Sequence, residues 1–304
     1  MRDIKKISFI GLGVMGGAMA VNMRKKGSEE VIVYDISSEL MKKYAAQGLT
    51  PAVSYADVSR GDVIFLSLPD SEIVESVLFS PGGVCENLEE GQILVDLSTI
   101  KYSTTIKIDK KLKEKGVKFL DAPVSGMAER AVDGTLAVMC GGDEDVFEKI
   151  RPYFERVGTN VAYMGQVGSG QFTKLINQLL FDINVAAVAE ILPLALKVGL
   201  NPEKTVDIVN SGTGRSFASE FFGPRILRDN FSDGYSLQAA YKDLVSASEI
   251  SASMNLPLPV LSAATTTYQM ALLKGYGEQN KGSMIRVFEE LFGVNFRSKG
   301  TQNG

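Results

Sequence analysis

The 304-residue sequence contains no histidine, and this absence removes several mechanisms at once. It excludes a Ser-His-Asp triad, a Cys-His couple, and zinc or haem sites that depend on imidazole. The two cysteines, Cys85 and Cys140, are too few for an all-cysteine metal site or a disulfide framework. Any acid–base chemistry therefore depends on Lys, Asp, Glu, Tyr or a lone Cys.

The sequence also lacks an excess of basic charge. Its 32 Lys and Arg residues are outnumbered by 36 Asp and Glu residues, which gives a net charge of −4, and no basic block occurs. We therefore expect no nucleic-acid partner and no binding to an anionic membrane. The N-terminal apolar run is short and interrupted by glycine, and no uninterrupted apolar stretch reaches the roughly 18 residues of a membrane span. With so few cysteines, these features predict a cytoplasmic protein without a membrane segment.

Short β-rich runs alternate with amphipathic helical stretches over the first half of the chain. Strands are predicted at 7–10, 31–34, 63–66, 93–95, 118–120, 136–140 and 161–164, and helices at 15–26, 40–47, 102–115 and 144–157. Alternation of this kind predicts βαβ units and a parallel sheet that is buried on both faces. Right-handed crossovers then make residues 1–165 a doubly wound α/β domain.

From residue 166 onward the pattern is helical. A glycine-rich turn, Gln166–Gly170, leads into a long apolar helix over 172–198, in which Pro193 is a candidate kink. Because this helix is apolar on almost every side, we expect it to be buried. Further helices are predicted at 202–211, 237–254, 261–273 and 283–292. Residues 166–304 are therefore predicted to form a second, all-α domain.

A glycine-rich loop, Gly11-Leu12-Gly13-Val14-Met15-Gly16, joins the first predicted strand to the first predicted helix. Its glycines permit a tight turn, a close approach of backbone amides to a pyrophosphate, and close packing of helix on strand. The anion then lies at the positive end of the helix. Asp35 directly follows the second predicted strand, where a carboxylate accepts hydrogen bonds from a ribose 2′-hydroxyl. Since Tyr34–Leu40 contains no arginine to neutralise a 2′-phosphate, we predict NAD in preference to NADP.

Lys174, Asn177 and Gln178 lie at positions i, i+3 and i+4 of the long predicted helix and so share one face. A lysine and two amides on an apolar helix are costly unless they line a site. The alternative is a lysine whose stem extends to solvent near a domain interface. Desolvation lowers the pKa of a lysine towards neutrality, which suits a proton carrier.

Polar groups also follow two later strands. Asp121-Ala-Pro-Val-Ser125-Gly126 offers the Ser125 hydroxyl and the amides of Gly126 and Met127 as an anion-binding nest, or forms a plain turn. In Asp96-Leu-Ser98-Thr99 the hydroxyls either bind the nicotinamide ribose or the substrate, or cap a helix.

The run Phe9-Ile-Gly-Leu-Gly-Val-Met-Gly-Gly-Ala-Met-Ala-Val-Asn22 resembles the signature of the β-hydroxyacid dehydrogenase family, which includes 3-hydroxyisobutyrate dehydrogenase and tartronate semialdehyde reductase. The resemblance extends to about Gly293 and implies an NAD-binding Rossmann domain followed by a helical substrate and oligomerisation domain. Gly168–Asn177 is similar to the family's catalytic G-x-G-x-x-x-K-x-x-N segment. It implies that Lys174 is the general acid in carbonyl reduction and the general base in alcohol oxidation. Asn177-Gln178 resembles the Asn-Gln of tartronate semialdehyde reductases, whereas many members have Asn-Asn.

The resemblance also implies binding roles elsewhere. The loop that ends at Met127 is similar to the family's substrate-carboxylate loop DAPVSGG, with Met127 in place of the last glycine. Leu68 and Pro69 are implied to lie against the cofactor. Lys242 is similar to the lysine of the family's KDL segment, which reaches the cofactor and substrate, or it belongs to an ordinary solvated Lys-Asp pair on a helix. Arg215 resembles an arginine of dicarboxylate-reducing members, or is an ordinary surface residue.

The sequence thus predicts an NAD-dependent oxidoreductase that interconverts a small anionic β-hydroxy acid and its semialdehyde. One alternative is an ω-hydroxy acid or semialdehyde reductase for a longer or doubly anionic substrate, of the 2-(hydroxymethyl)glutarate, succinic semialdehyde or sulfolactaldehyde type. Another is a non-catalytic NAD-binding module. Apolar side chains near the long helix, such as Phe221 and Phe222, are expected to be exposed and to pack in a homodimer or homotetramer.

Overall fold

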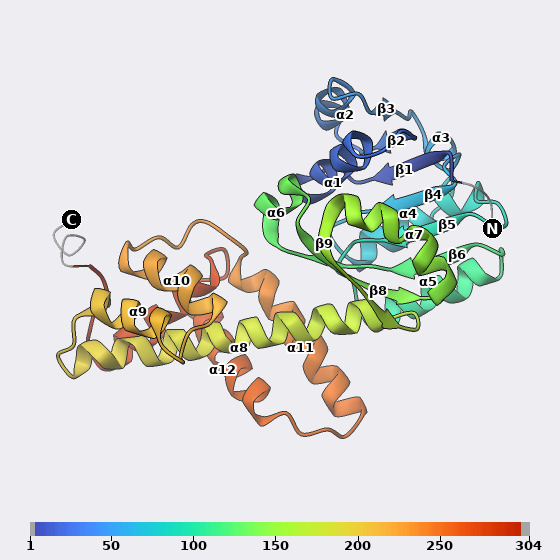
Figure 1. The fold of residues 1–304 in the computed structure, drawn as a ribbon. Helices are drawn as coiled ribbons and strands as arrows, with labels where there is room; N and C mark the ends of the chain where they lie inside the picture. Colours follow the sequence, from blue (N-terminus) through green and yellow to red (C-terminus); the bar gives the residue numbers. More distant parts are fainter. Residues whose placement is uncertain (1–3, 299–304) are drawn as a thin grey trace. The chain divides into compact units, whose positions relative to one another are not determined.

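The computed structural model describes residues 4–298, which form two compact units. The first unit ends at Lys174 and the second begins at Leu175, so the division falls inside helix α8 (Ser169–Lys197). The predicted fold class is confirmed, because a parallel-rich α/β unit of the Rossmann type precedes an all-helical one (Figure 1).

A nine-stranded sheet forms the centre of the first unit, in the order β3-β2-β1-β4-β5-β6-β8-β7 with β9 beside β8. Its strands are β1 (Lys6–Ile10), β2 (Glu30–Tyr34), β3 (Thr50–Pro51), β4 (Val63–Leu66), β5 (Ile93–Asp96), β6 (Lys118–Asp121), β7 (Val124–Ser125), β8 (Leu136–Gly142) and β9 (Gly158–Gly165). Every neighbouring pair from β3 to β6 is parallel. The expectation of a wholly parallel sheet is wrong beyond β6, where β8 runs antiparallel to both β6 and β7. The two-residue strands β3 and β7 were missed because they are too short to show a pattern.

Helices cover both faces of this sheet because its strands are apolar on both sides. The helical segments are α1 (Val14–Lys25), α2 (Ser38–Ala45), α3 (Tyr55–Val58), α4 (Ser71–Phe79), η1 (Val84–Glu86), α5 (Tyr102–Lys113), α6 (Met127–Asp133) and α7 (Glu144–Val157). Ile7 and Phe9 of β1 belong to one core cluster, with side chains of α1 and α7 such as Phe147. Ile10 of the same strand belongs to a second cluster, with side chains of α4 and α5 such as Ile108. The alternation along β1 therefore builds a core on each face.

The second unit consists of helices around α8. They are α9 (Pro202–Ser211), α10 (Phe217–Leu227), α11 (Leu237–Ser253), α12 (Pro259–Leu273), η2 (Lys281–Met284) and α13 (Ile285–Phe292). An ion pair lies in its core, where Lys281 Nζ is 2.5 Å from Asp182 Oδ1 and both side chains are buried. The Tyr268 hydroxyl donates to the same carboxylate oxygen at 3.2 Å. Burial lowers the pKa of Lys281, and the attraction of Asp182 opposes this change.

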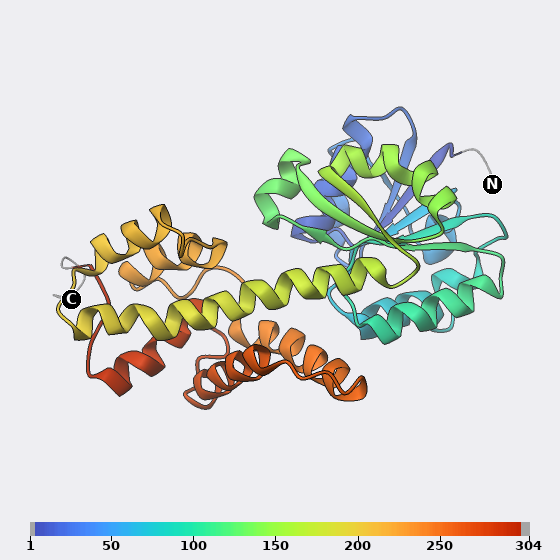
Figure 2. The same ribbon diagram turned by 60° about the horizontal axis from the view of Figure 1, so that its bottom comes forward.

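Helix α8 runs through Pro193 without a break (Figure 2). Complete burial of this helix was expected, but only 33% of its most apolar 18-residue window is buried in the described chain. Leu180, Ile191 and Leu194 are exposed on it. By length and composition α8 would suffice to cross a membrane, a test that core helices of soluble proteins also pass. The expected exposure of Phe222 is wrong, because this ring is buried in the helical core.

Candidate active site

The glycine-rich loop connects β1 to α1, and its glycines have different tasks. A Cβ on Gly11, which has φ +92°, would lie 2.2 Å from the Ser67 carbonyl oxygen, and one on Gly16 would lie 2.1 Å from the Gly11 carbonyl oxygen. These two glycines are therefore required for packing. A Cβ on Gly13 would meet nothing within 4 Å, so this residue leaves open space beside the first turn of α1. That turn has no side-chain cap and no acidic residue, which fits the pyrophosphate of NAD.

Asp35 follows β2 and holds the backbone of the glycine-rich loop. Its Oδ2 accepts the Leu12 amide at 2.7 Å, and its Oδ1 accepts the Ser37 amide at 2.8 Å. The sequence predicts Asp35 as a ribose acceptor and gives no sign of this second task. The contact with Leu12 places the carboxylate directly beside the loop.

Further predicted residues of the first unit follow the carboxyl ends of its parallel strands. Leu68 and Pro69 follow β4, and Ser98 and Thr99 follow β5. The Ser98 hydroxyl accepts the Leu68 amide at 2.9 Å, so it connects these two loops. Helix α5 begins at Tyr102 without a side-chain cap, and Ser98 is therefore not a helix cap.

The loop after β6 contains a strained residue. Ser125 ends β7, Gly126 has φ +145°, and Met127 begins α6 with φ +63°. Non-glycine residues rarely adopt this left-handed conformation, which costs about 1–2 kcal/mol. The Met127 side chain is 47% exposed. Strain of this kind clusters at functional sites.

Two buried carboxylates, Asp96 and Asp121, end the neighbouring strands β5 and β6, where they are paired in register. Burial raises the pKa of Asp96 to about 7, while a hydrogen bond from the Ser98 amide opposes the rise. Burial raises the pKa of Asp121 to about 6, and backbone donors from Gly168 and Gln171 oppose it. Oδ2 of Asp96 has no hydrogen-bond partner among the described residues. Neither carboxylate was singled out from the sequence, although Asp96 and Asp121 directly follow the predicted strands 93–95 and 118–120. Burial brings the pKa values of both close to neutrality in a chain without histidine.

Asp121 also fixes the start of the helix that carries Lys174. Its Oδ1 accepts the Gly168 amide at 2.7 Å, and its Oδ2 accepts the Gln171 amide at 2.9 Å. Lys174 follows one turn after Gln171 and is buried, with 8% of its surface exposed. Asn177 and Gln178 lie on the next turn of α8.

Two predicted residues belong to the helical unit. Arg215 precedes α10 and pairs with Glu220, with Nε 2.6 Å from Oε1. Lys242 lies exposed on α11.

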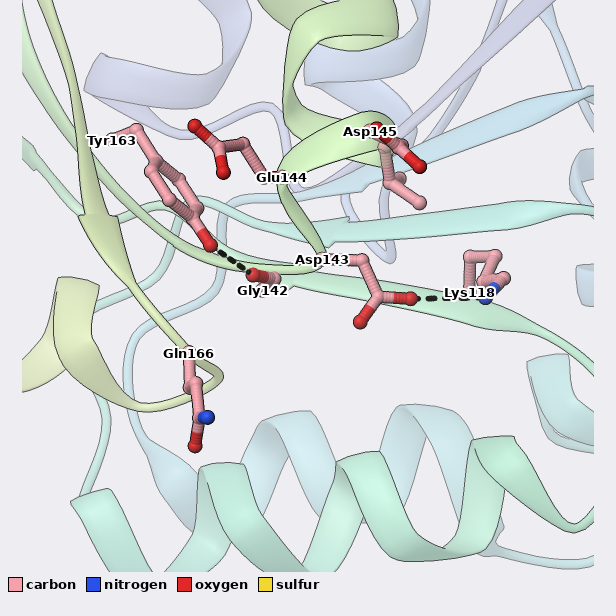
Figure 3. Close-up of a pocket in the computed structure, with 8 residues that line it drawn as sticks. Lys118, Gly142, Asp143, Glu144, Asp145, Tyr163 and Gln166 are labelled. Carbon is pink, nitrogen blue, oxygen red and sulfur yellow. Dashed lines mark hydrogen bonds and ion pairs between the residues drawn. The ribbon is translucent and has the colours of Figure 1, made fainter.

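A hollow of about 420 Å³ lies beside the start of β6 and the end of β8 (Figure 3). Asp143 on its wall pairs with Lys118 at 2.9 Å, and Glu144 and Asp145 add two carboxylates. The Tyr163 hydroxyl points to the Gly142 carbonyl and donates to it at 2.9 Å. Because its lining is mainly acidic, this hollow repels an anionic cofactor or substrate.

Comparisons with known proteins agree with this arrangement. Residues 6–165 match the family described as the NAD binding domain of 6-phosphogluconate dehydrogenase. Residues 168–288 match the family described as NAD-binding of NADP-dependent 3-hydroxyisobutyrate dehydrogenase.

Individual relatives match over almost the whole chain. The chain is 38% identical to 2-(hydroxymethyl)glutarate dehydrogenase of Eubacterium barkeri, over 95% of this chain and 96% of the relative. It is 32% identical to 2-hydroxy-3-oxopropionate reductase of Escherichia coli, over 93% and 97%. A solved structure of 3-hydroxyisobutyrate dehydrogenase from Salmonella typhimurium superposes with a TM-score of 0.83 at 27% identity, covering 94% of this chain and all of the other. The chain therefore belongs to the β-hydroxyacid dehydrogenase family and is an NAD-dependent oxidoreductase of hydroxy acid and semialdehyde pairs.

Proposed function

We propose that Lys174 is the general acid when this enzyme reduces a small anionic semialdehyde, and the general base when it oxidises the β-hydroxy acid. The observation that carries this proposal is a buried lysine on the second turn of α8, a helix whose first turn is bonded to the carboxyl edge of the sheet. Ligands bind at this edge in doubly wound folds. Burial favours the neutral form of a lysine amine, and this form can accept a proton. Since the chain has no histidine, another side chain has to carry the proton, and we assign this role to the amine of Lys174.

The other polar groups would orient the substrate. When NADH is bound it supplies the hydride. The amides of Gly126 and Met127 and the Ser125 hydroxyl would hold the substrate carboxylate, because a positive-φ turn directs successive N–H groups to one side. Asn177 and Gln178 would orient the carbonyl and the lysine.

The test is replacement of the lysine. Lys174→Ala should lower kcat by about 100- to 10,000-fold, the usual contribution of a general acid or base. The dissociation constant of NADH should change by less than about threefold, because the glycine-rich loop is untouched. Lys197→Ala, at the far end of the same helix, is the matched control and should keep its activity. Near-normal kcat in Lys174→Ala, measured by NADH absorbance, would contradict the assignment.

We propose that Thr99, Leu68, Pro69 and Lys242 complete the binding of cofactor and substrate, and that Asp35 makes NAD the preferred cofactor. Thr99 lies exposed beside the buried Ser98, so its hydroxyl is accessible.

The Asp35 carboxylate repels a 2′-phosphate placed next to the Leu12 amide that it binds. Steady-state rates with NAD and NADP at equal substrate concentration test this preference.

A doubly anionic substrate is a second candidate, favoured by the 38% identity to 2-(hydroxymethyl)glutarate dehydrogenase. Arg215 would bind the second carboxylate, since a guanidinium suits planar, bidentate recognition. Arg215 forms an ion pair with Glu220 in the structure, and this ion pair would break when the substrate binds. Arg215→Met should raise KM for 2-(hydroxymethyl)glutarate and leave KM for 3-hydroxyisobutyrate unchanged, whereas Arg228→Met, also exposed, should affect neither. Equal effects on both substrates would count against this role.

We also propose that the enzyme is a cytoplasmic homo-oligomer, a dimer or a tetramer, that buries the exposed apolar residues of α8 against a second copy. Leu180, Ile191 and Leu194 are 60%, 58% and 48% exposed. Exposed apolar clusters of this kind mark association surfaces. Leu194→Glu should shift the mass measured by light scattering towards the monomer, and an unchanged mass would place the contact elsewhere.

A further inference from the structure

The side chain of Gln171 holds the loop after β5 on both sides of Thr99. Its Nε2 donates to the Ser98 carbonyl at 2.7 Å, and its Oε1 accepts the Ile100 amide at 3.1 Å. Gln171 is 3% exposed, and Ser98 and Ile100 are buried, whereas Thr99 between them is exposed. The carboxamide therefore forms two hydrogen bonds with this loop, as the peptide group of a neighbouring strand would. Thr99, between the two bonded residues, faces outward.

The backbone of Gln171 is fixed at the same time. Asp121 accepts the Gln171 amide and the Gly168 amide on its two carboxylate oxygens. This close approach requires Gly170, because a Cβ there would lie 2.3 Å from the Met139 carbonyl oxygen and 2.5 Å from that of Asp121. The first turn of α8 is thus bonded to β6 through its backbone and to the loop after β5 through one side chain.

The same loop is bonded to its other neighbours. The Ser98 hydroxyl accepts the Leu68 amide, and the Ser98 amide donates to Asp96, each at 2.9 Å. Gln171 therefore joins the start of α8 to a network that already connects the loops after β4 and β5. Lys174 lies one helical turn beyond this junction.

We propose that Gln171 is a positioning residue, which sets the place of Thr99 relative to Lys174 in the reaction. The proposal rests on the proposed function, because Lys174 has to be the proton carrier for its position to matter. Catalytic geometry is sensitive, and a displacement of about 1 Å costs about 100-fold in rate. Loss of the two carboxamide hydrogen bonds is therefore expected to reduce kcat by about 10- to 100-fold.

The test variant is Gln171→Met, which keeps the length of the side chain and removes both hydrogen bonds. The matched control is Thr173→Val, since Thr173 Oγ1 donates only within α8, to the Ser169 carbonyl at 2.7 Å. The measurements are kcat, KM, the NADH dissociation constant, and hydrogen exchange of the peptide that contains Ile100. We expect lower kcat, NADH binding within about threefold of wild type, and faster exchange at Ile100, in Gln171→Met alone. Wild-type kcat in Gln171→Met would overturn the proposal.

A second variant covers the case in which Gln171→Met does not fold. Gln171→Glu keeps the shape and the acceptor for the Ile100 amide, and its protonated form also donates to the Ser98 carbonyl. Asp121 on β6 and Asp96 on β5 are ionisable members of this network, and Lys174 lies one turn further along α8. The activity of Gln171→Glu relative to wild type should therefore rise as the pH falls. A ratio that does not change with pH would show that Gln171 only packs, and would overturn the positioning role.

The two proposals fail in different ways. Suppose that Lys174→Ala remains active while Gln171→Met speeds hydrogen exchange at Ile100. The hydrogen bonds of Gln171 then exist, but Lys174 is not the proton carrier, and the positioning role fails with it. If Lys174→Ala is inactive while Gln171→Met has normal kcat, only the positioning role fails.

Discussion

The buried carboxylate of Asp96 should make the stability of this enzyme depend on pH in a direction opposite to that of most acidic residues. Its pKa is raised from 3.8 to about 7, mainly by burial, and one of its oxygens has no hydrogen-bond partner among the described residues. At about 1.36 kcal/mol per pKa unit, this rise is worth about 4 kcal/mol. The folded protein keeps the proton while the unfolded chain releases it above pH 3.8. The contribution of Asp96 to the free energy of unfolding therefore falls between pH 4 and 7, and this loss is complete above pH 7.

Asp96→Asn should remove this dependence. The asparagine keeps an acceptor for the Ser98 amide and carries no charge, so it resembles the protonated acid. Relative to wild type, the variant should gain about 4 kcal/mol between pH 4 and pH 7.5. Part of the wild-type slope should remain, because burial also raises the pKa of Asp121, to about 6.

Urea unfolding followed by circular dichroism at several pH values between 4 and 8 measures the difference. Asp143→Asn is the matched control, since Asp143 is an exposed carboxylate near the same sheet that pairs with Lys118. Its curve should run parallel to that of the wild type. If the Asp96→Asn curve also runs parallel, Asp96 does not change its ionisation between these pH values, and the argument from burial is refuted.

Asp35→Ser should raise kcat/KM with NADPH relative to NADH by about tenfold, because it removes a repulsion of about 1.4 kcal/mol, and steady-state rates with both cofactors measure it. Met127→Gly should keep the free energy of unfolding within about 1 kcal/mol of the wild-type value, because relief of backbone strain at φ +63° offsets the greater flexibility of glycine. The same variant should change the ratio of kcat/KM between short and long semialdehydes. Asp182→Ala should cost about 3–5 kcal/mol in urea unfolding, because the charge of Lys281 stays buried without its partner, and the double variant Asp182→Leu/Lys281→Met should recover most of the loss. A small loss in Asp182→Ala would show that Lys281 loses its proton instead.

The sequence predicts the fold class well because its information is local and periodic. Every predicted strand and helix is present, and α9 matches its predicted range of 202–211. The reversal of direction at β8 could not be read from the sequence, because an antiparallel pair buried on both faces carries the same apolar run as a parallel one. Short elements such as α3 and β7 fall below the length at which a period shows.

The site is predictable only in part, for a different reason. Lys174 and the glycine-rich loop stand out as polar or flexible residues against an apolar pattern. Gln171 and Asp121 do not stand out, because their roles depend on contacts between segments 47 to 73 residues apart. Packing of distant segments, which no local pattern encodes, decides which carboxylate is buried and which loop a glutamine holds.

The exposed apolar surface of α8 has a consequence for how the protein is made. A chain leaves the ribosome from its N-terminus, and its N-terminal domain generally folds first. The sheet and its helices are complete once Lys174 has emerged, whereas α8 has to wait for α9 to α13, which follow it in the chain. At roughly 5–20 residues per second, the roughly 90 residues from α9 to α13 take about 5–20 s to synthesise. During that interval the helix that carries the proposed catalytic lysine lacks the helices that cover part of its apolar surface, and association with other chains competes with its folding.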